Sequence, residues 1–156
     1  MLFQSNLPAG ISRIKESGFT LIELLVVIAI IGVLATVGFG SFQSSLTKGR
    51  DAQRKHDLGQ IQKALEMYLN DKGKYPTSIP NLTTSGEWRD TNGTLYMKSV
   101  PQGPRGDYYC YEADPTSTSY QLYATLENMK DPKKITPASA NCASYNYGVS
   151  SSNTTP

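Results

Sequence analysis

Residues 17–23 read Ser-Gly-Phe-Thr-Leu-Ile-Glu, and this short stretch decides how the rest of the chain is interpreted. It opens an apolar run over residues 19–39 that is interrupted by two threonines, a few small residues and the carboxylate of Glu23. About 20 apolar residues, each rising about 1.5 Å along a helix, span a bilayer, so the run is long enough to cross a membrane. An acidic side chain costs roughly 2.5–3.5 kcal/mol or more near the bilayer centre, which indicates a functional reason for Glu23.

The apolar run allows three interpretations. Arg13 and Lys15 precede it, and the positive-inside rule therefore predicts that residues 1–18 lie in the cytoplasm and that the rest is exported. A secretory signal would be cut after the apolar run, where residues 35–39 offer only a weak site. A plain signal anchor explains the length and the orientation but not Glu23. The third interpretation places the cut between Gly18 and Phe19 and keeps the run in the mature protein.

Residues 18–28, Gly-Phe-Thr-Leu-Ile-Glu-Leu-Leu-Val-Val-Ile, closely resemble the N-terminal motif of type IV pilins and of the pseudopilins of type II secretion. The resemblance implies that a prepilin peptidase removes a cytoplasmic leader, residues 1–18, by cutting after Gly18. It implies that the same enzyme methylates the new amino group of Phe19. It also implies a role in assembly for Glu23, which becomes the fifth residue of the mature chain.

An ion pair gives Glu23 a physical role. Cleavage would create an α-ammonium group on Phe19, and two opposite charges that pair in lipid lose much of the cost of burial. Positions i and i+4 of one helix are close enough for such a pair within a chain. The resemblance implies instead that Glu23 pairs with the Phe19 ammonium of a neighbouring subunit. A glutamate whose carboxylate reaches the membrane interface is the alternative.

Residues 41–72 are expected to continue the apolar helix of residues 19–40 as an amphipathic segment. Leu58, Ile61, Leu65 and Tyr68 recur at spacings of three and four residues, which predicts one apolar stripe packed against a sheet of the same chain. Gly73 is a stop signal for this helix.

A basic cluster lies on the same segment. It consists of Lys48, Arg50, Arg54, Lys55 and His56. Two aspartates dilute the cluster and no aromatic residue interleaves with it, so a solvated or membrane-proximal surface is favoured over nucleic-acid binding. The net charge of +2 gives no further reason to expect a nucleic-acid partner.

Residues 73–147 are expected to form a globular head. Short strands are predicted over residues 95–99, 107–112 and 120–126, with a turn between the last two. Nine of the ten tyrosines lie between Tyr75 and Tyr147, which suggests a Tyr-rich surface, and residues 148–156 are expected to be a flexible tail. The predicted fold is therefore α+β and pilin-like, with a long N-terminal helix, transmembrane in its first half, packed on a small C-terminal antiparallel β-sheet.

Cys110 and Cys142 are the only cysteines. Export from the cytoplasm permits a disulfide between them, which would attach the last part of the chain to the central strand. Two free, buried thiols are the alternative.

Neither an active site nor a metal centre is expected. The single histidine, His56, lies in a polar helix, and the chain has no P-loop and no metal-ligand spacing of cysteine or histidine. The stretch at residues 73–76 and the strand at residues 120–123 resemble the pattern of major pseudopilins, several of which bind Ca²⁺ after that strand. Here Glu127, Asn128 and Asp131 are followed by a proline and two lysines, so neither a metal nor another cofactor is expected.

These observations predict a structural subunit of a type II secretion pseudopilus or type IV pilus-like filament that supports protein secretion. Its expected partners are prepilin peptidase, identical subunits, minor pilins or pseudopilins, the inner-membrane assembly platform and, before assembly, membrane lipid. It is expected to cross the inner membrane once, with the N-terminus in the cytoplasm and the head outside it. Two alternatives are open: a type IV pilin for adhesion, motility or DNA uptake, and a monomeric membrane-anchored extracytoplasmic binding protein.

Overall fold

The computed structural model describes residues 18–137 and 139–156, and for residues 37–41 the backbone alone. The leader predicted over residues 1–18 lies outside the described residues except for Gly18. The chain divides into two compact units, Met1–Gly40 and Ser41–Pro156.

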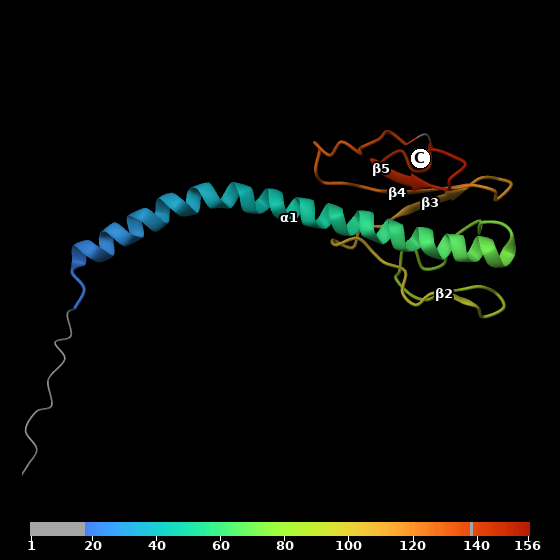
Figure 1. Ribbon diagram of the computed structural model, residues 1–156, viewed down its shortest axis with the longest axis horizontal. Coiled ribbons are helices and arrows are strands. Elements are labelled where there is room, and N and C mark those ends of the chain that lie inside the picture. The colour runs from blue at the N-terminus through green and yellow to red at the C-terminus, as the bar shows by residue number, and fades with distance from the viewer. Residues whose placement is uncertain (1–17, 138) are drawn as a thin grey trace, which may run out of the picture. The chain divides into compact units, whose positions relative to one another are not determined.

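One helix, α1, covers Leu21–Lys72 (Figure 1). The absence of proline between Pro8 and Pro76 allows a helix of this length, since each interior proline would remove a hydrogen bond. The helix begins two residues later than the apolar run, because Thr20 acts as its N-cap. It ends as the stop signal predicts: Gly73 has a φ of 71° and its N–H donates to the Leu69 carbonyl at 2.7 Å.

The first unit exposes its apolar side chains. Phe19 is 92% exposed, and the large hydrophobic residues between Leu21 and Leu34 are all exposed. Among the described residues, no helical segment combines the length and the apolarity that crossing a membrane requires.

In the described part of the second unit, the strands form two antiparallel sheets. β1 (Trp88–Arg89) pairs with β2 (Leu95–Met97), and β3 (Cys110–Ala113), β4 (Tyr120–Ala124) and β5 (Tyr147–Ser150) follow the order β3-β4-β5 (Figure 1). The three predicted strands are present but shorter than expected. The α+β class is confirmed, with a helix packed on small antiparallel sheets.

The tail prediction is wrong for the start of the segment at residues 148–156. Residues 148–150 belong to β5, where Leu122 opposes Val149 and Tyr123 opposes Gly148. Beyond the strand, Gln121 Nε2 donates to the Thr155 carbonyl at 2.7 Å and Ser150 Oγ donates to the Thr154 carbonyl at 2.6 Å. The serine and threonine content predicted a flexible tail. Instead, hydrogen bonds made by residues 150–155 hold this terminal segment in place beside β4.

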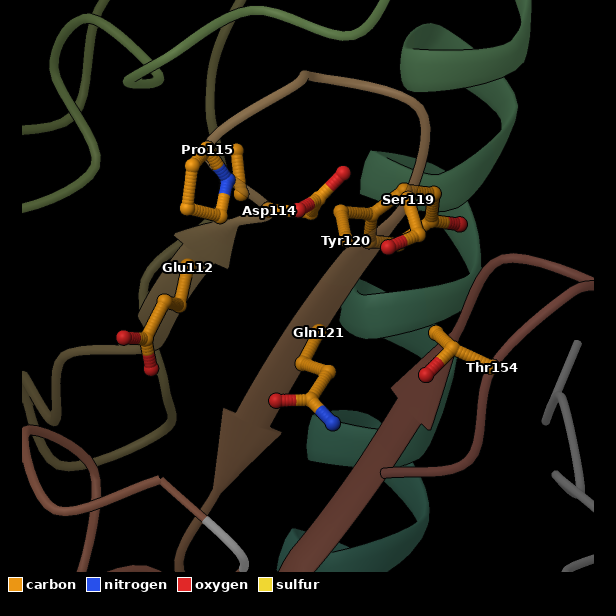
Figure 2. Close-up of a pocket in the computed structure, with 8 residues that line it drawn as sticks. Glu112, Asp114, Pro115, Ser119, Tyr120, Gln121 and Thr154 are labelled. Carbon is orange, nitrogen blue, oxygen red and sulfur yellow. The ribbon is translucent and has the colours of Figure 1, made fainter.

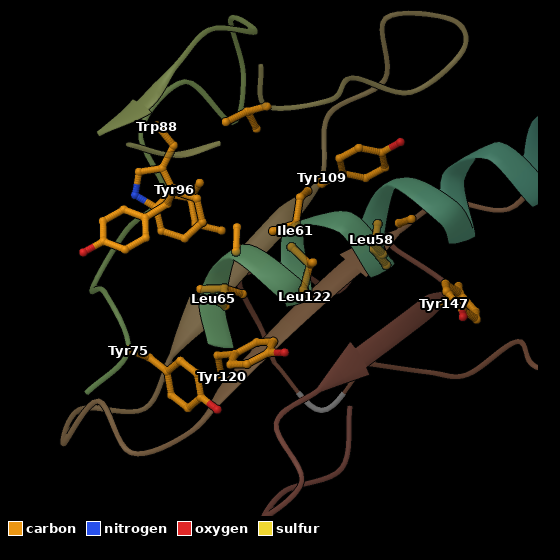
Figure 3. Packing of buried hydrophobic residues seen from close by; sticks show 14 of the residues in the cluster. Leu58, Ile61, Leu65, Tyr75, Trp88, Tyr96, Tyr109, Tyr120, Leu122 and Tyr147 are labelled. Carbon is orange, nitrogen blue, oxygen red and sulfur yellow. The ribbon is translucent and has the colours of Figure 1, made fainter. Parts of the chain in front are cut away.

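The hydrophobic core lies between the second half of α1 and the head (Figure 3). Leu58, Ile61 and Leu65 are fully buried, so the predicted apolar stripe is confirmed. On β4, Tyr120, Leu122 and Ala124 are buried, and so is Tyr123, whose side chain points to the opposite face of the strand.

The prediction of a Tyr-rich surface is wrong, because most of the tyrosine side chains are buried. Those with less than a tenth of their surface exposed are Tyr75, Tyr96, Tyr109, Tyr120, Tyr123 and Tyr147. Tyr75 and Tyr120 meet edge to face with ring centroids 4.7 Å apart, a geometry that stabilises aromatic pairs. Aromatic rings thus make up a large share of the core of the head, beside aliphatic side chains such as Ile61, Val100 and Leu122.

A disulfide joins Cys110, at the start of β3, to Cys142. Its Cα atoms lie 5.9 Å apart and the two residues are separated by 32 positions. The bridge therefore attaches the segment before β5 to the edge strand of the three-stranded sheet.

Candidate functional site

The N-terminal motif forms a capping box at the start of α1. The backbone N–H and the hydroxyl of Thr20 both donate to Glu23 Oε2 at 2.8 Å, and the Glu23 N–H donates to Thr20 Oγ1 at 3.3 Å. This reciprocal pairing satisfies donors that the first helical turn leaves without a partner. The carboxylate also lies where the helix dipole favours negative charge.

The capping box uses only one oxygen of Glu23. Within residues 18–137 and 139–156, Glu23 Oε1 accepts no hydrogen bond from the chain, and it stands on a surface of exposed apolar side chains. Gly18 and Phe19 precede the helix and are both exposed. The motif thus presents a peptide bond outside regular structure, followed by one turn that carries a fixed carboxylate.

A second polar site lies in the head, around Arg54 of α1. The Arg54 side chain is 2% exposed and contacts three carboxylates. Nη1 donates to Asp51 Oδ1 at 2.8 Å, Nη2 donates to Glu127 Oε1 at 2.8 Å, and Nε donates to Asp107 Oδ2 at 3.0 Å. Asp107 precedes β3 and Glu127 follows β4, so one guanidinium joins two distant segments to the helix.

Asp51 fixes the chain after β4 by a different contact. Its two carboxylate oxygens accept the backbone N–H groups of Glu127 at 2.9 Å and Asn128 at 2.8 Å. Because Asp51 is also buried, these bonds satisfy a charge that would otherwise be costly.

Arg50 completes the network on Glu127. Its Nη2 and Nε donate to the two Glu127 oxygens at 2.5 and 2.9 Å, a bidentate geometry that suits guanidinium and carboxylate. Hydrogen bonds from Arg50, and then from Arg54, lower the pKa of Glu127 to about 2 although partial burial opposes the shift. Nearby, the buried Tyr109 hydroxyl donates to Asp57 Oδ2 at 2.6 Å, and burial together with this bond raises the pKa of Tyr109.

The network corrects the interpretation of the basic cluster as a solvated or membrane-proximal surface. Arg50 and Arg54 face the head, whereas His56 is exposed. The sequence signals that could have revealed this are the three-residue spacing of Asp51 and Arg54 and the four-residue spacing of the arginines, which place these groups on one helical face. Their partners on the head could not be assigned, because they lie more than 50 residues away.

The head carries a pocket of about 290 Å³ over the turn between β3 and β4 (Figure 2). Glu112 and Asp114 are its acidic residues. Glu112 accepts hydrogen bonds from Ser139 and Asn141, and Asp114 accepts them from Thr116 and Thr118. Both carboxylates therefore hold local structure. In the part of the chain that the structure describes, no three histidine, cysteine or acidic side chains are grouped to hold a metal ion.

Two family models match the chain. Residues 13–39 match the prokaryotic N-terminal methylation motif, and residues 42–132 match type II secretion system (T2SS), protein G. The first match covers the Gly18–Phe19 junction and Glu23. The second match covers α1 from residue 42 onward and strands β1 to β4, and it includes Arg54 and its partners Asp107 and Glu127.

Curated relatives also match the chain. The chain is 33% identical over 119 residues to the type II secretion system core protein G of Pseudomonas aeruginosa, covering 72% of this chain and 84% of the relative. Proteins of the same name from Aeromonas hydrophila and Vibrio cholerae are 33% and 32% identical, over 61% and 62% of this chain and 71% and 70% of their own lengths. No solved structure matches the chain significantly.

Proposed function

The chain belongs to the protein G family of the type II secretion system, and from this premise we propose that it is the structural subunit of a pseudopilus that supports protein secretion. The family consists of filament subunits rather than enzymes. The subunit acts mechanically, by adding to a helical filament outside the cytoplasm.

The observation that carries the proposal is the exposed apolar surface of the first unit. In a single chain, Leu21, Ile22, Leu24, Val33 and Leu34 each have more than 60% of their surface exposed. Water disfavours such a contiguous apolar surface, and surfaces of this kind mark membrane or protein contacts. Lipid covers it before assembly, with residues 19–40 crossing the inner membrane, and the same segments of neighbouring subunits cover it in the filament.

The polar groups of the motif control the change between these two environments. Prepilin peptidase cuts between Gly18 and Phe19 and methylates the Phe19 amino group. The resulting ammonium pairs with Glu23 of a neighbouring subunit. This ion pair fixes the axial offset between neighbouring apolar helices, which apolar contacts alone would leave variable. The minor pseudopilins and the inner-membrane assembly platform are the further partners of this process.

Intact mass of the membrane-extracted protein tests the processing step. We expect a chain that begins at Phe19 and carries one additional methyl group, and a chain that begins at Met1 when the peptidase is absent from the host. An unmodified chain that begins at Met1, remains monomeric and is still functional would support the anchored binding protein instead.

Deletion of the gene in its own host tests the role in secretion. We expect exported enzymes to accumulate in the periplasm and to reach the medium again when the gene is restored on a plasmid. If secretion persists while motility, adhesion or DNA uptake is lost, the chain is a type IV pilin.

A further inference from the structure

The loop that follows β4 is held by basic side chains of α1. Residues 127–134 read Glu-Asn-Met-Lys-Asp-Pro-Lys-Lys, with two acidic and three basic side chains. Its first acid, Glu127, lies against the guanidinium groups of Arg50 and Arg54. Its second, Asp131, receives the Lys55 ammonium on Oδ2 at 2.5 Å and the Lys133 N–H on Oδ1 at 2.9 Å.

Lys55 is itself held in place. Its Nζ lies 5.3 Å from the centroid of the Tyr147 ring at the start of β5, which favours a cation at that position. The ammonium therefore bridges the loop, the helix and the three-stranded sheet. The third side-chain oxygen of the loop that could bind a metal ion, Asn128 Oδ1, accepts a hydrogen bond from the Lys130 N–H at 3.1 Å.

These residues do not fit a Ca²⁺ ion, which binds this segment in several proteins that the chain resembles. Ca²⁺ requires six to eight oxygen ligands, several of them anionic. The side-chain oxygens of Glu127, Asn128 and Asp131 are engaged with cations or backbone N–H groups of the chain. A divalent ion would also have to displace the positive groups of Arg50, Arg54 and Lys55.

We infer that side-chain cations take the structural place of a metal ion in this chain, so that the loop at residues 127–134 is ordered without Ca²⁺. Arg50 and Arg54 fix its beginning and Lys55 fixes its centre. The inference concerns the order and stability of the head, and it stands whether or not the proposed role in secretion is correct.

Thermal unfolding of the full chain in detergent tests the metal independence. Circular dichroism is recorded in EDTA and in about 5 mM CaCl₂, above the roughly millimolar dissociation constants of weak extracellular Ca²⁺ sites. We expect the same Tm in both. A Ca²⁺ ion bound only by the folded head with a Kd of about 0.1–1 mM would raise the Tm by roughly 4–10 °C at this concentration, and a rise of that size would overturn the inference.

Trypsin tests whether Lys55 orders the loop, because Lys130, Lys133 and Lys134 are cleavage sites within it. Lys55→Met is compared with Lys63→Met, which removes an exposed lysine from the same helix. We expect cleavage at residues 130–134 to be several-fold faster in Lys55→Met than in Lys63→Met, and equally fast in EDTA and CaCl₂. Equal cleavage of the two variants, or protection of either by CaCl₂, would overturn the inference.

Discussion

Thr20 and Glu23 hold each other across the first turn of α1, and all the hydrogen bonds that Thr20 donates fall on one oxygen, Glu23 Oε2. The carboxylate can therefore serve two purposes at once. One oxygen caps the helix in which it lies, and the other is available to a neighbouring subunit. The capping hydrogen bonds alone explain the position of the Glu23 side chain. Variants are therefore needed that remove either the helix cap or the negative charge, but not both.

Glu23→Gln separates them, because glutamine at this position still completes a capping box while carrying no charge. We expect the leader to be processed normally and filament yield to fall sharply, since the Phe19 ammonium of the neighbouring subunit loses its counter-ion. Leader processing is followed by the change in mass and assembly by the amount of sheared filament.

Thr20→Ala is the matched control for this experiment. It keeps the Glu23 charge and removes the side-chain cap, at a cost of about 1 kcal/mol to the helix. We expect filament yield to stay closer to that of the native chain than to that of Glu23→Gln. Normal filaments from Glu23→Gln would refute the pairing role, and the capping box alone would then account for Glu23.

The disulfide is expected to contribute to the stability of the head. Closing a loop of 32 positions stabilises a fold by about 3.7 kcal/mol in the chain-entropy model. The double variant Cys110→Ala and Cys142→Ala should lower the free energy of unfolding in urea by about this amount, and dithiothreitol should destabilise the native chain but not the variant. Two thiols that react in the unreduced native protein would contradict the bridge.

Local patterns in the sequence predict the parts of this fold that depend on local chemistry. The stripe of Leu58, Ile61 and Leu65 follows from helical spacing, and the glycine stop at Gly73 follows from its preference for positive φ. The capping box follows from local chemistry too, since a threonine followed three residues later by a glutamate, Thr20 and Glu23, is its sequence signature.

Long-range relationships were not readable from the same patterns. The burial of Arg54 depends on Asp107, which precedes β3, and on Glu127, which lies between β4 and β5 in the sequence. β5 reads Tyr-Gly-Val-Ser and carries no apolar alternation, and only its pairing with the distant β4 identifies it as a strand. The local sequence around a helical arginine is the same whether its guanidinium is solvated or, like that of Arg54, surrounded by three carboxylates.

The low pKa of Glu127 predicts a loss of stability in acid. Its carboxyl group has a pKa of about 2 in the folded chain and an ordinary value of 4.5, so the unfolded chain binds the proton first as the pH falls. This contribution is complete above about pH 5 and disappears as the pH falls from about 4.5 to about 2. The free energy of unfolding in urea should decline through that range.

Glu127→Gln identifies the group responsible. The variant should be less stable than the native chain at neutral pH, because Arg50 and Arg54 lose a counter-ion, and its decline in acid should be shallower. Parallel declines of the two proteins would assign the acid sensitivity to other carboxylates.

Arg54→Met tests the centre of the network. The substitution keeps an unbranched side chain but leaves Asp51, which is 3% exposed, without its cation, and removal of one partner of a buried ion pair costs about 3–5 kcal/mol. Arg105→Met is the matched control, since Arg105 is 63% exposed and lies 3.8 Å from Glu127, so it should change the stability by less than about 0.5 kcal/mol. Urea unfolding measures both. Equal stabilities would mean that Asp51 is satisfied by the backbone N–H groups of Glu127 and Asn128 alone, and that Arg54 does not hold the head to the helix.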